Sequence, residues 1–229
     1  MGETLKSEFW HERWKKGQTG FHNAEVNARL IEHWPEIGAP QDAPVFVPLC
    51  GKSLDLHWLK ERGHPVVGVE LSAIAVGEFF ADSKISPTRT QSGALERFSA
   101  DHFDIYCGDL FDLGAEELAS ARACYDRGSI VALPPELRVR YAEHLTKILP
   151  REMTILMLTL EYDQSKMSGP PHSVPPEEIE RLFGAAFEVD TLWSSDWVDA
   201  SPRFQARGLE TRRDHVLRLR RGMAESRSR

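Results

Sequence analysis

The chain has 229 residues, of which 41% are hydrophobic and 28% charged, a composition that supports the packed core of one α/β domain or two small ones. Its formal net charge of -7 argues against a nucleic-acid partner, because phosphate backbones are bound by clustered Lys and Arg. No window approaches the ~18 consecutive apolar residues of a membrane span, and the charged start lacks the apolar core of a signal peptide.

Short apolar runs alternate with helical patterns along most of the chain, which predicts stacked βαβ units around a largely parallel sheet. Before this alternation lies an arm with three aromatic residues, Trp10, Trp14 and Phe21 (the arm aromatics), followed by an amphipathic helix that ends near Trp34. The predicted strands are 45–50, 65–70, 103–107, 121–125, 154–160, 187–192 and 215–219, the last two as an antiparallel pair at one edge. The predicted helices are 53–63, 73–83, 135–149 and 177–183.

The loop after the first strand and the end of the second strand give the strongest signal for a ligand. Ligands of open parallel sheets lie beyond the carboxyl ends of the strands, and Gly51 permits a close backbone approach there. Glu70 ends the second strand, where a carboxylate can accept hydrogen bonds from both ribose hydroxyls of an adenosine. The glycines that bring a backbone to a pyrophosphate are missing, which favours S-adenosylmethionine over NAD. The alternative is that Gly51 only forms a tight turn.

Other positions have both a functional and a structural interpretation. Asp109 or its backbone can bind the edge of an adenine, with Leu110 over its face, or Asp109 can cap a helix. Arg127 follows the fourth strand and can point into the crevice or be a surface cation. The arm aromatics can line a pocket that attracts a sulfonium, or they can simply pack together. The basic run 212–221 alternates with apolar residues, which indicates a solvated strand face.

Several chemistries lack their sequence patterns. The chain has no His-Glu-x-x-His pair and no Cys-x-x-Cys, so we expect no metal site. It also lacks the nucleophile elbow of a hydrolase and a complete phosphate-binding loop. Each of the three cysteines lies in or at the end of an apolar run, which predicts free thiols in a reducing compartment, the cytoplasm.

Taken together, these residues resemble the thiopurine S-methyltransferase family. The combination of the PLCGK loop with the RGHPVVGVE strand is highly specific, and the matches extend over nearly the whole chain in the family's order. The matching stretches are FWHERW (9–14), GFH (20–22), VPLCGK (47–52), RGHPVVGVE (62–70), YDRG (125–128), GPP (169–171) and EIERLFG (178–184).

The resemblance implies an α/β, Rossmann-like class I methyltransferase fold, with a seven-stranded, mostly parallel sheet and an antiparallel last strand. It implies S-adenosyl-L-methionine as donor and S-adenosyl-L-homocysteine as product. Phe21 would face the acceptor and Arg203 would approach it from the far side, so that Arg127 and Arg203 are the expected catalytic residues. The expected donor-binding residues are Trp10, Trp14, Leu49, Gly51, Glu70, Asp109, Leu110 and Arg127.

The implied reaction is a direct in-line methyl transfer to the thiol of a small aromatic or heterocyclic molecule such as a thiopurine. The sequence shows no His–Asp pair that would remove a thiol proton, which favours an acceptor that is already acidic. The alternatives are an enzyme for small inorganic acceptors (thiocyanate, halide, selenium or tellurium species) and a non-catalytic regulator that binds S-adenosylmethionine. We expect a monomer with one methyltransferase domain over 1–221, whose residues 1–34 cover the active site, a disordered tail over 222–229, and no nucleic-acid or membrane partner.

Overall fold

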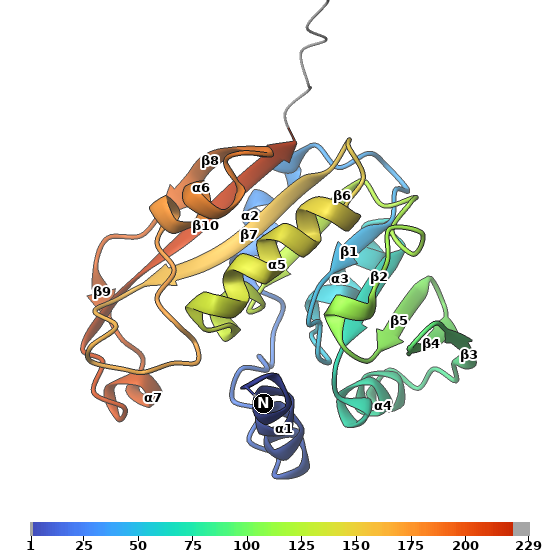
Figure 1. Ribbon diagram of the computed structural model, residues 1–229, viewed down its shortest axis with the longest axis horizontal. Coiled ribbons are helices and arrows are strands. Elements are labelled where there is room, and N and C mark those ends of the chain that lie inside the picture. Colours follow the sequence, from blue (N-terminus) through green and yellow to red (C-terminus); the bar gives the residue numbers. More distant parts are fainter. Residues whose placement is uncertain (1, 222–229) are drawn as a thin grey trace, which may run out of the picture.

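A sheet of ten strands forms the centre of the protein, whose residues 2–221 are described by a computed structural model (Figure 1). The expected tail over 222–229 lies outside the described residues. Seven strands have the order β5-β2-β1-β6-β7-β10-β8, in which β10 is antiparallel to both of its neighbours, as the resemblance implied. These strands are β1 (Val45–Val47), β2 (Val66–Glu70), β5 (Phe103–Cys107), β6 (Ala123–Arg127), β7 (Thr154–Glu161), β8 (Phe187–Ser194) and β10 (Thr211–Arg221).

The expected number of seven strands is too low, because three more strands extend this core. β3 (Thr88–Ser92) and β4 (Leu95–Ala100) form a hairpin on the edge strand β5, and β9 (Val198–Asp199) pairs with the start of β10. None of the residues of β3 is buried, so this strand lacks the apolar alternation by which strands are recognised in a sequence.

The boundaries of the first and the last strand differ from the prediction, the first for a local reason and the last because of strand pairing. The first strand ends at Val47 rather than at position 50, since Pro48 has no backbone N–H for the ladder. The last strand begins at Thr211 rather than at 215, so the first arginines of the basic run belong to it. The additional residues of β10 pair with β9 and with the end of β7, which brings them to the carboxyl edge of the parallel strands.

Helices cover both faces of the sheet, and each face has its own hydrophobic core. Alternation along the strands creates the two cores, since Val45 and Val47 face one and Phe46 faces the other. α5 (Pro135–Ile148) and α6 (Pro176–Phe183) cover the face that is nearer in Figure 1. The other face is covered by α2 (Ala28–His33), the 3-10 helix η1 (Trp34–Ile37), α3 (Asp55–Glu61) and α4 (Ala73–Asp82).

The amino-terminal helix α1 (Gly2–Lys15) belongs to neither layer. Figure 1 shows it beyond the edge of the sheet, at the same end of the molecule as α7 (Pro202–Gln205). Two short 3-10 helices, η2 (Leu110–Asp112) and η3 (Ile130–Ala132), follow β5 and β6 at that end. Among residues 2–221, no helix has the length and apolar character needed to cross a membrane.

Candidate active site

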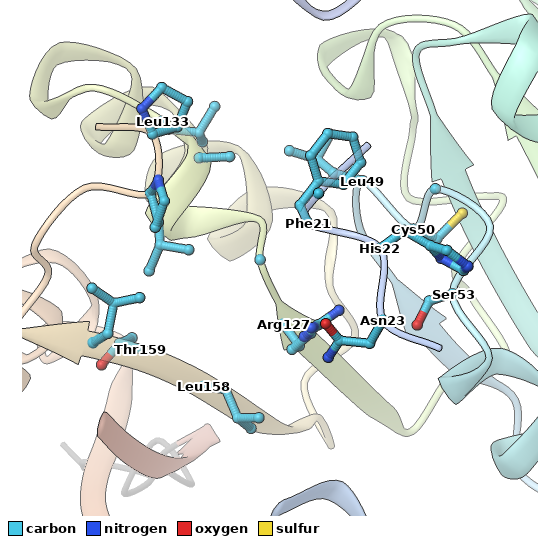
Figure 2. A pocket seen from close by; sticks show the side chains of 18 of the residues that line it. Phe21, His22, Asn23, Leu49, Cys50, Ser53, Arg127, Leu133, Leu158 and Thr159 are labelled. Atoms are coloured by element: carbon cyan, nitrogen blue, oxygen red, sulfur yellow. The ribbon is translucent and has the colours of Figure 1, made fainter. Parts of the chain in front are cut away.

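A cavity of about 570 Å³ lies at the edge of the sheet where β1, β2, β5, β6 and β7 end. Figure 2 shows Phe21 and Leu49 on one side of the cavity and Leu158 and Thr159 on the other, with Arg127 between them. What each residue does toward a ligand stays a prediction. All the residues that the sequence predicted for the site line this one cavity: Trp10, Trp14, Phe21, Leu49, Gly51, Glu70, Asp109, Leu110, Arg127 and Arg203.

Glu70 fastens the loop that follows β1. Its Oε2 accepts a hydrogen bond from the Gly51 N–H at 2.9 Å, and its Oε1 accepts one from the Ser72 N–H at 2.8 Å. Burial raises the pKa of this carboxyl, and the hydrogen bonds from the backbone of Ser72 and Gly51 oppose the rise. A carboxylate has four acceptor positions, so Glu70 can accept hydrogen bonds from a ligand in addition to those from the backbone.

The loop after β1 has an unusual backbone at two positions. Gly51 has φ of 54°, which glycine adopts without strain, and Leu49 has φ of 44°, which a branched side chain resists. Strain of this kind is concentrated at functional sites, where the surrounding structure maintains it. The indole of Trp14 packs against the loop at Gly51. A Cβ added to this glycine would lie 3.5 Å from the indole ring.

The structural interpretation of Asp109 is confirmed. Its Oδ1 accepts a hydrogen bond from the Phe111 N–H at 3.0 Å and thereby caps η2. Leu110, the next residue, is buried and contributes an apolar wall to the cavity. The capping bond uses one lone pair of the carboxylate, so the rest of the carboxylate and the backbone of the loop are left for an adenine edge.

The arm aromatics both pack together and line the cavity. The ring centroid of Phe21 lies 5.6 Å from that of Trp10 and 5.5 Å from that of Trp14, in edge-to-face arrangements. Such pairs are the preferred geometry of aromatic rings. The two interpretations of the arm are therefore compatible, because the cluster that holds the arm together is also a wall of the cavity.

Arg127, the last residue of β6, has no carboxylate partner within the part of the chain that is described, 2–221. Its position depends on Asp126, which is buried and accepts hydrogen bonds from the Tyr141 hydroxyl at 2.8 Å and the Ser129 N–H at 3.3 Å. Ser129 Oγ in turn donates to the Pro48 carbonyl at 2.8 Å, which joins the turns after β6 and β1. An unpaired guanidinium at this junction is available to an anionic ligand.

Four arginines that the sequence did not predict line the cavity together with Arg127 and Arg203: Arg13, Arg29, Arg207 and Arg212. The guanidinium of Arg203 lies against Gly20, where a Cβ would be 2.7 Å from its Nη1. Burial and the charges of Arg207 and Arg13 lower the pKa of Arg203. Arg203 and Arg212 also lie over the same ring, that of Phe204, at 5.5 and 5.4 Å.

The prediction of a solvated strand face over 212–221 is right for one part of the strand and wrong for another. Arg218 and Arg220 lie on β10 and form ion pairs with Asp190 of the neighbouring strand, at 2.9 and 3.1 Å. Arg212 lies at the start of the same strand and lines the cavity instead. The alternation of the run gave no signal for this difference, which depends on where the strand lies in the sheet.

A second group missed by the sequence lies where β7 meets β10. Thr159 and His215 are direct partners in the ladder, both are buried, and both line the cavity. His215 Nε2 lies 3.3 Å from Glu161 Oε2, and its Nδ1 lies 2.8 Å from Ser194 Oγ. Burial lowers the pKa of His215 and Glu161 opposes this, so the imidazole is neutral at neutral pH. The histidine and its carboxylate are 54 positions apart on different strands, so no local pattern could identify them.

The side-chain hydroxyl of Thr159 is a further indication of a ligand in the cavity. It is buried and has no hydrogen-bond partner among the residues 2–221. A buried unpaired hydroxyl costs about 1–3 kcal/mol, so such a group at a cavity wall indicates a partner supplied by a ligand.

Within the described residues, no cluster of three or more His, Cys, Asp or Glu is placed to hold a metal ion.

A family model and relatives in bacteria match this chain over almost its whole length. The family described as Thiopurine S-methyltransferase (TPMT) matches residues 5–222. The Thiopurine S-methyltransferase of Pseudomonas fluorescens (strain Pf0-1) is 45% identical over 94% of this chain and 99% of its own. That of Xanthomonas axonopodis pv. citri (strain 306) is 46% identical over 95% of this chain and 100% of its own.

A solved structure shows the same fold at much lower sequence identity. It is the Burkholderia thailandensis 1,6-didemethyltoxoflavin-N1-methyltransferase with bound 1,6-didemethyltoxoflavin and S-adenosylhomocysteine. The TM-score is 0.64 at 16% identity, over 96% of this chain and 88% of that one. This likeness shows the fold alone, whereas the sequence relatives cover both chains almost completely.

Proposed function

We propose that this chain, which belongs to the thiopurine S-methyltransferase family, transfers the methyl group of S-adenosylmethionine to the thiol of an aromatic or heterocyclic molecule such as a thiopurine. The match to the family over residues 5–222 carries the proposal. The cavity supports it, since its two ends have the different characters that a donor and an acceptor need.

The donor end fits an adenosine that carries a sulfonium. Glu70 keeps acceptor positions beyond its hydrogen bonds with the backbone, which suits the hydroxyls of a ribose. Leu110 is the apolar wall for an adenine ring, and the faces of Trp10 and Trp14 attract a cation. When bound, S-adenosylmethionine supplies the methyl group and leaves as S-adenosylhomocysteine after in-line attack by the acceptor sulfur.

The residues of the acceptor end bind and orient an anion. Arg127 has no carboxylate partner in the described chain, so its charge favours the thiolate form of the acceptor, which is the reactive form. Arg203 acts on the same anion from the far side of the cavity. Holding donor and acceptor in line contributes up to about 7–11 kcal/mol in well-oriented systems. Phe21 and the rest of the arm exclude water from the junction.

The acceptor walls favour an aromatic molecule over thiocyanate, halide or selenium and tellurium species. Beyond Arg127 the cavity continues between apolar side chains, which a small inorganic ion would not contact on all sides. A non-catalytic regulator that binds S-adenosylmethionine would not need the arginines at that end. The apolar side chains that form the acceptor walls are Leu158, Leu160, Pro170, Pro171 and Phe204.

The test is turnover with methyl-labelled S-adenosylmethionine. We expect labelled S-methyl products from thiophenol and 6-mercaptopurine, and much lower rates with alkyl thiols, phenols and amines at neutral pH. Equal rates with phenols or amines would contradict the thiol assignment. Turnover of thiocyanate or iodide without turnover of aromatic thiols would establish the inorganic alternative. Binding of S-adenosylhomocysteine without turnover of any acceptor would establish a regulator.

We infer one methyltransferase domain over residues 1–221, a monomer, and a cytoplasmic location. The free thiols of Cys50, Cys107 and Cys124 support a reducing compartment. Sedimentation with S-adenosylhomocysteine present tests the monomer, and we expect full activity after treatment with EDTA, since the mechanism needs no metal.

A further inference from the structure

The turn that follows β5 is held from one side by the helix α5. Leu110 and Phe111, which belong to this turn, line the donor end of the cavity. The Nε2 atom of His144, on α5, lies 3.0 Å from the carbonyl oxygen of Leu110. Because a carbonyl oxygen can only accept a hydrogen bond, this ring nitrogen carries a hydrogen and donates it. Burial lowers the pKa of His144 and the backbone of Leu110 opposes this, so the imidazole is neutral at neutral pH.

Phe111, the next residue of the turn, is held by the same face of α5. The guanidinium of Arg140 lies over the Phe111 ring, 4.2 Å from its centroid. The imidazole of His144 meets this ring edge-to-face, with the two centroids 5.4 Å apart. Arg140 and His144 are four positions apart, so they share one face of the helix. Cation–π and edge-to-face contacts are both favourable, and α5 therefore contacts both apolar residues of the turn that line the cavity.

The 3-10 helix η2, which forms this turn, has only three residues. Short 3-10 helices have poor hydrogen-bond geometry, so the shape of η2 depends on what it packs against. Leu110 and Leu113 are buried in the hydrophobic core that α5 covers. Apolar burial is not directional, however, and does not fix where the backbone N–H and C=O groups of the turn point. The hydrogen bond from His144 is directional, and it acts on the carbonyl of a residue in the cavity wall.

We propose that His144 is a positioning residue for the donor: it fixes η2 in the orientation that binds the edge of adenine, and thereby determines the preference for this base. The inference rests on the proposed binding of S-adenosylmethionine. His144 does not itself line the cavity, so it acts through Leu110 and Phe111. Adenine presents an amino group and an unprotonated N1 along its edge, whereas hypoxanthine presents a carbonyl oxygen and an N1–H. Polar groups held in one orientation match only one of these two patterns.

The experiment compares S-adenosylhomocysteine with S-inosylhomocysteine, which differ only in the base, by calorimetric titration. We expect the wild-type protein to bind the adenosyl compound about tenfold or more tightly than the inosyl compound. His144→Leu, which loses the N–H donor, should reduce this ratio to about threefold or less. His144→Gln should keep most of it, since its amide can donate to the Leu110 carbonyl. Glu143→Gln, at an exposed neighbouring position of α5, is the matched control and should keep the full ratio.

The ratio of the two affinities separates positioning from a general loss of stability. Trp34→Phe removes the buried hydrogen bond from Trp34 Nε1 to His64 Nε2 at 3.3 Å, on the opposite face of the sheet. It should lower the melting temperature and leave the ratio unchanged. A wild-type ratio near one, or a His144→Leu ratio equal to that of the wild type, would overturn the inference and leave the proposed function intact. The expected ratios without turnover of any thiol would overturn the proposed function alone.

Discussion

Replacement of Glu70 by Gln tests the donor end of the cavity. The carboxylate of Glu70 already accepts hydrogen bonds from the N–H groups of Gly51 and Ser72, at 2.9 and 2.8 Å. The backbone N–H of Leu71 acts on the same carboxylate, and the lone pairs that remain are available to the ribose hydroxyls of the donor. The amide of Gln keeps a single acceptor oxygen, and its NH2 group would face a backbone N–H. At most one ribose hydroxyl can therefore still donate a hydrogen bond to the side chain.

The expected loss follows from this count. A hydrogen bond to a charged group contributes about 1.5–3 kcal/mol, so the Kd of S-adenosylhomocysteine should rise about 10- to 150-fold in Glu70→Gln. Calorimetry measures this Kd directly. Glu188→Gln, an exposed glutamate on β8 paired with Arg220, is the matched control and should bind normally. Thermal unfolding without ligand should change little, because the lost backbone hydrogen bond is opposed by removal of a buried charge.

The pH dependence provides a second test of the same group. Burial raises the pKa of Glu70 in the folded protein above its value in the unfolded chain. Protonation of Glu70 at low pH therefore increases the free energy of unfolding. That stability is lost as pH rises from the unfolded value of about 4.3 through the folded pKa. Ribose hydroxyls bind the ionised form, so donor affinity should fall as pH falls through the raised pKa, and Glu70→Gln should lose this dependence. Unchanged affinity in a folded Glu70→Gln protein would remove Glu70 from the site.

Other perturbations test the acceptor end and the arm. Arg127→Ala should reduce kcat/KM for aromatic thiols most at low pH and be partly rescued at high pH, where the thiol ionises unaided; a defect that does not vary with pH would refute the role of Arg127. Thr159→Val should raise KM about 5- to 50-fold for 6-mercaptopurine but little for thiophenol, since only the purine offers heteroatoms to the buried hydroxyl. Equal effects on both substrates would assign Thr159 to structure. In hydrogen exchange, α1 and the loop that holds Pro170 and Pro171 should gain protection when S-adenosylhomocysteine binds, and equal protection in both states would reduce them to fixed packing.

Local patterns in the sequence determined the βαβ core and the residues that follow its strands. Buried parallel strands such as 66–70 are continuous apolar runs, so they can be recognised without knowledge of their neighbours. The carboxyl ends of parallel strands meet at one edge, which is why Gly51, Glu70 and Arg127 could be assigned to one crevice from the sequence. For Arg203, the signal was the family resemblance rather than a local pattern.

Only the tertiary structure decided what surrounds the acceptor. Arg212, Thr159 and His215 come from antiparallel or late strands, where the position of a side chain depends on strand pairing rather than on its neighbours in the chain. The same basic run contains the paired arginines Arg218 (half-buried) and Arg220 (exposed) and an arginine of the cavity, although its alternation is uniform. Burial and partners of a charge are properties of the packed sheet, so the group of arginines at the acceptor end emerged only when the strands were placed together.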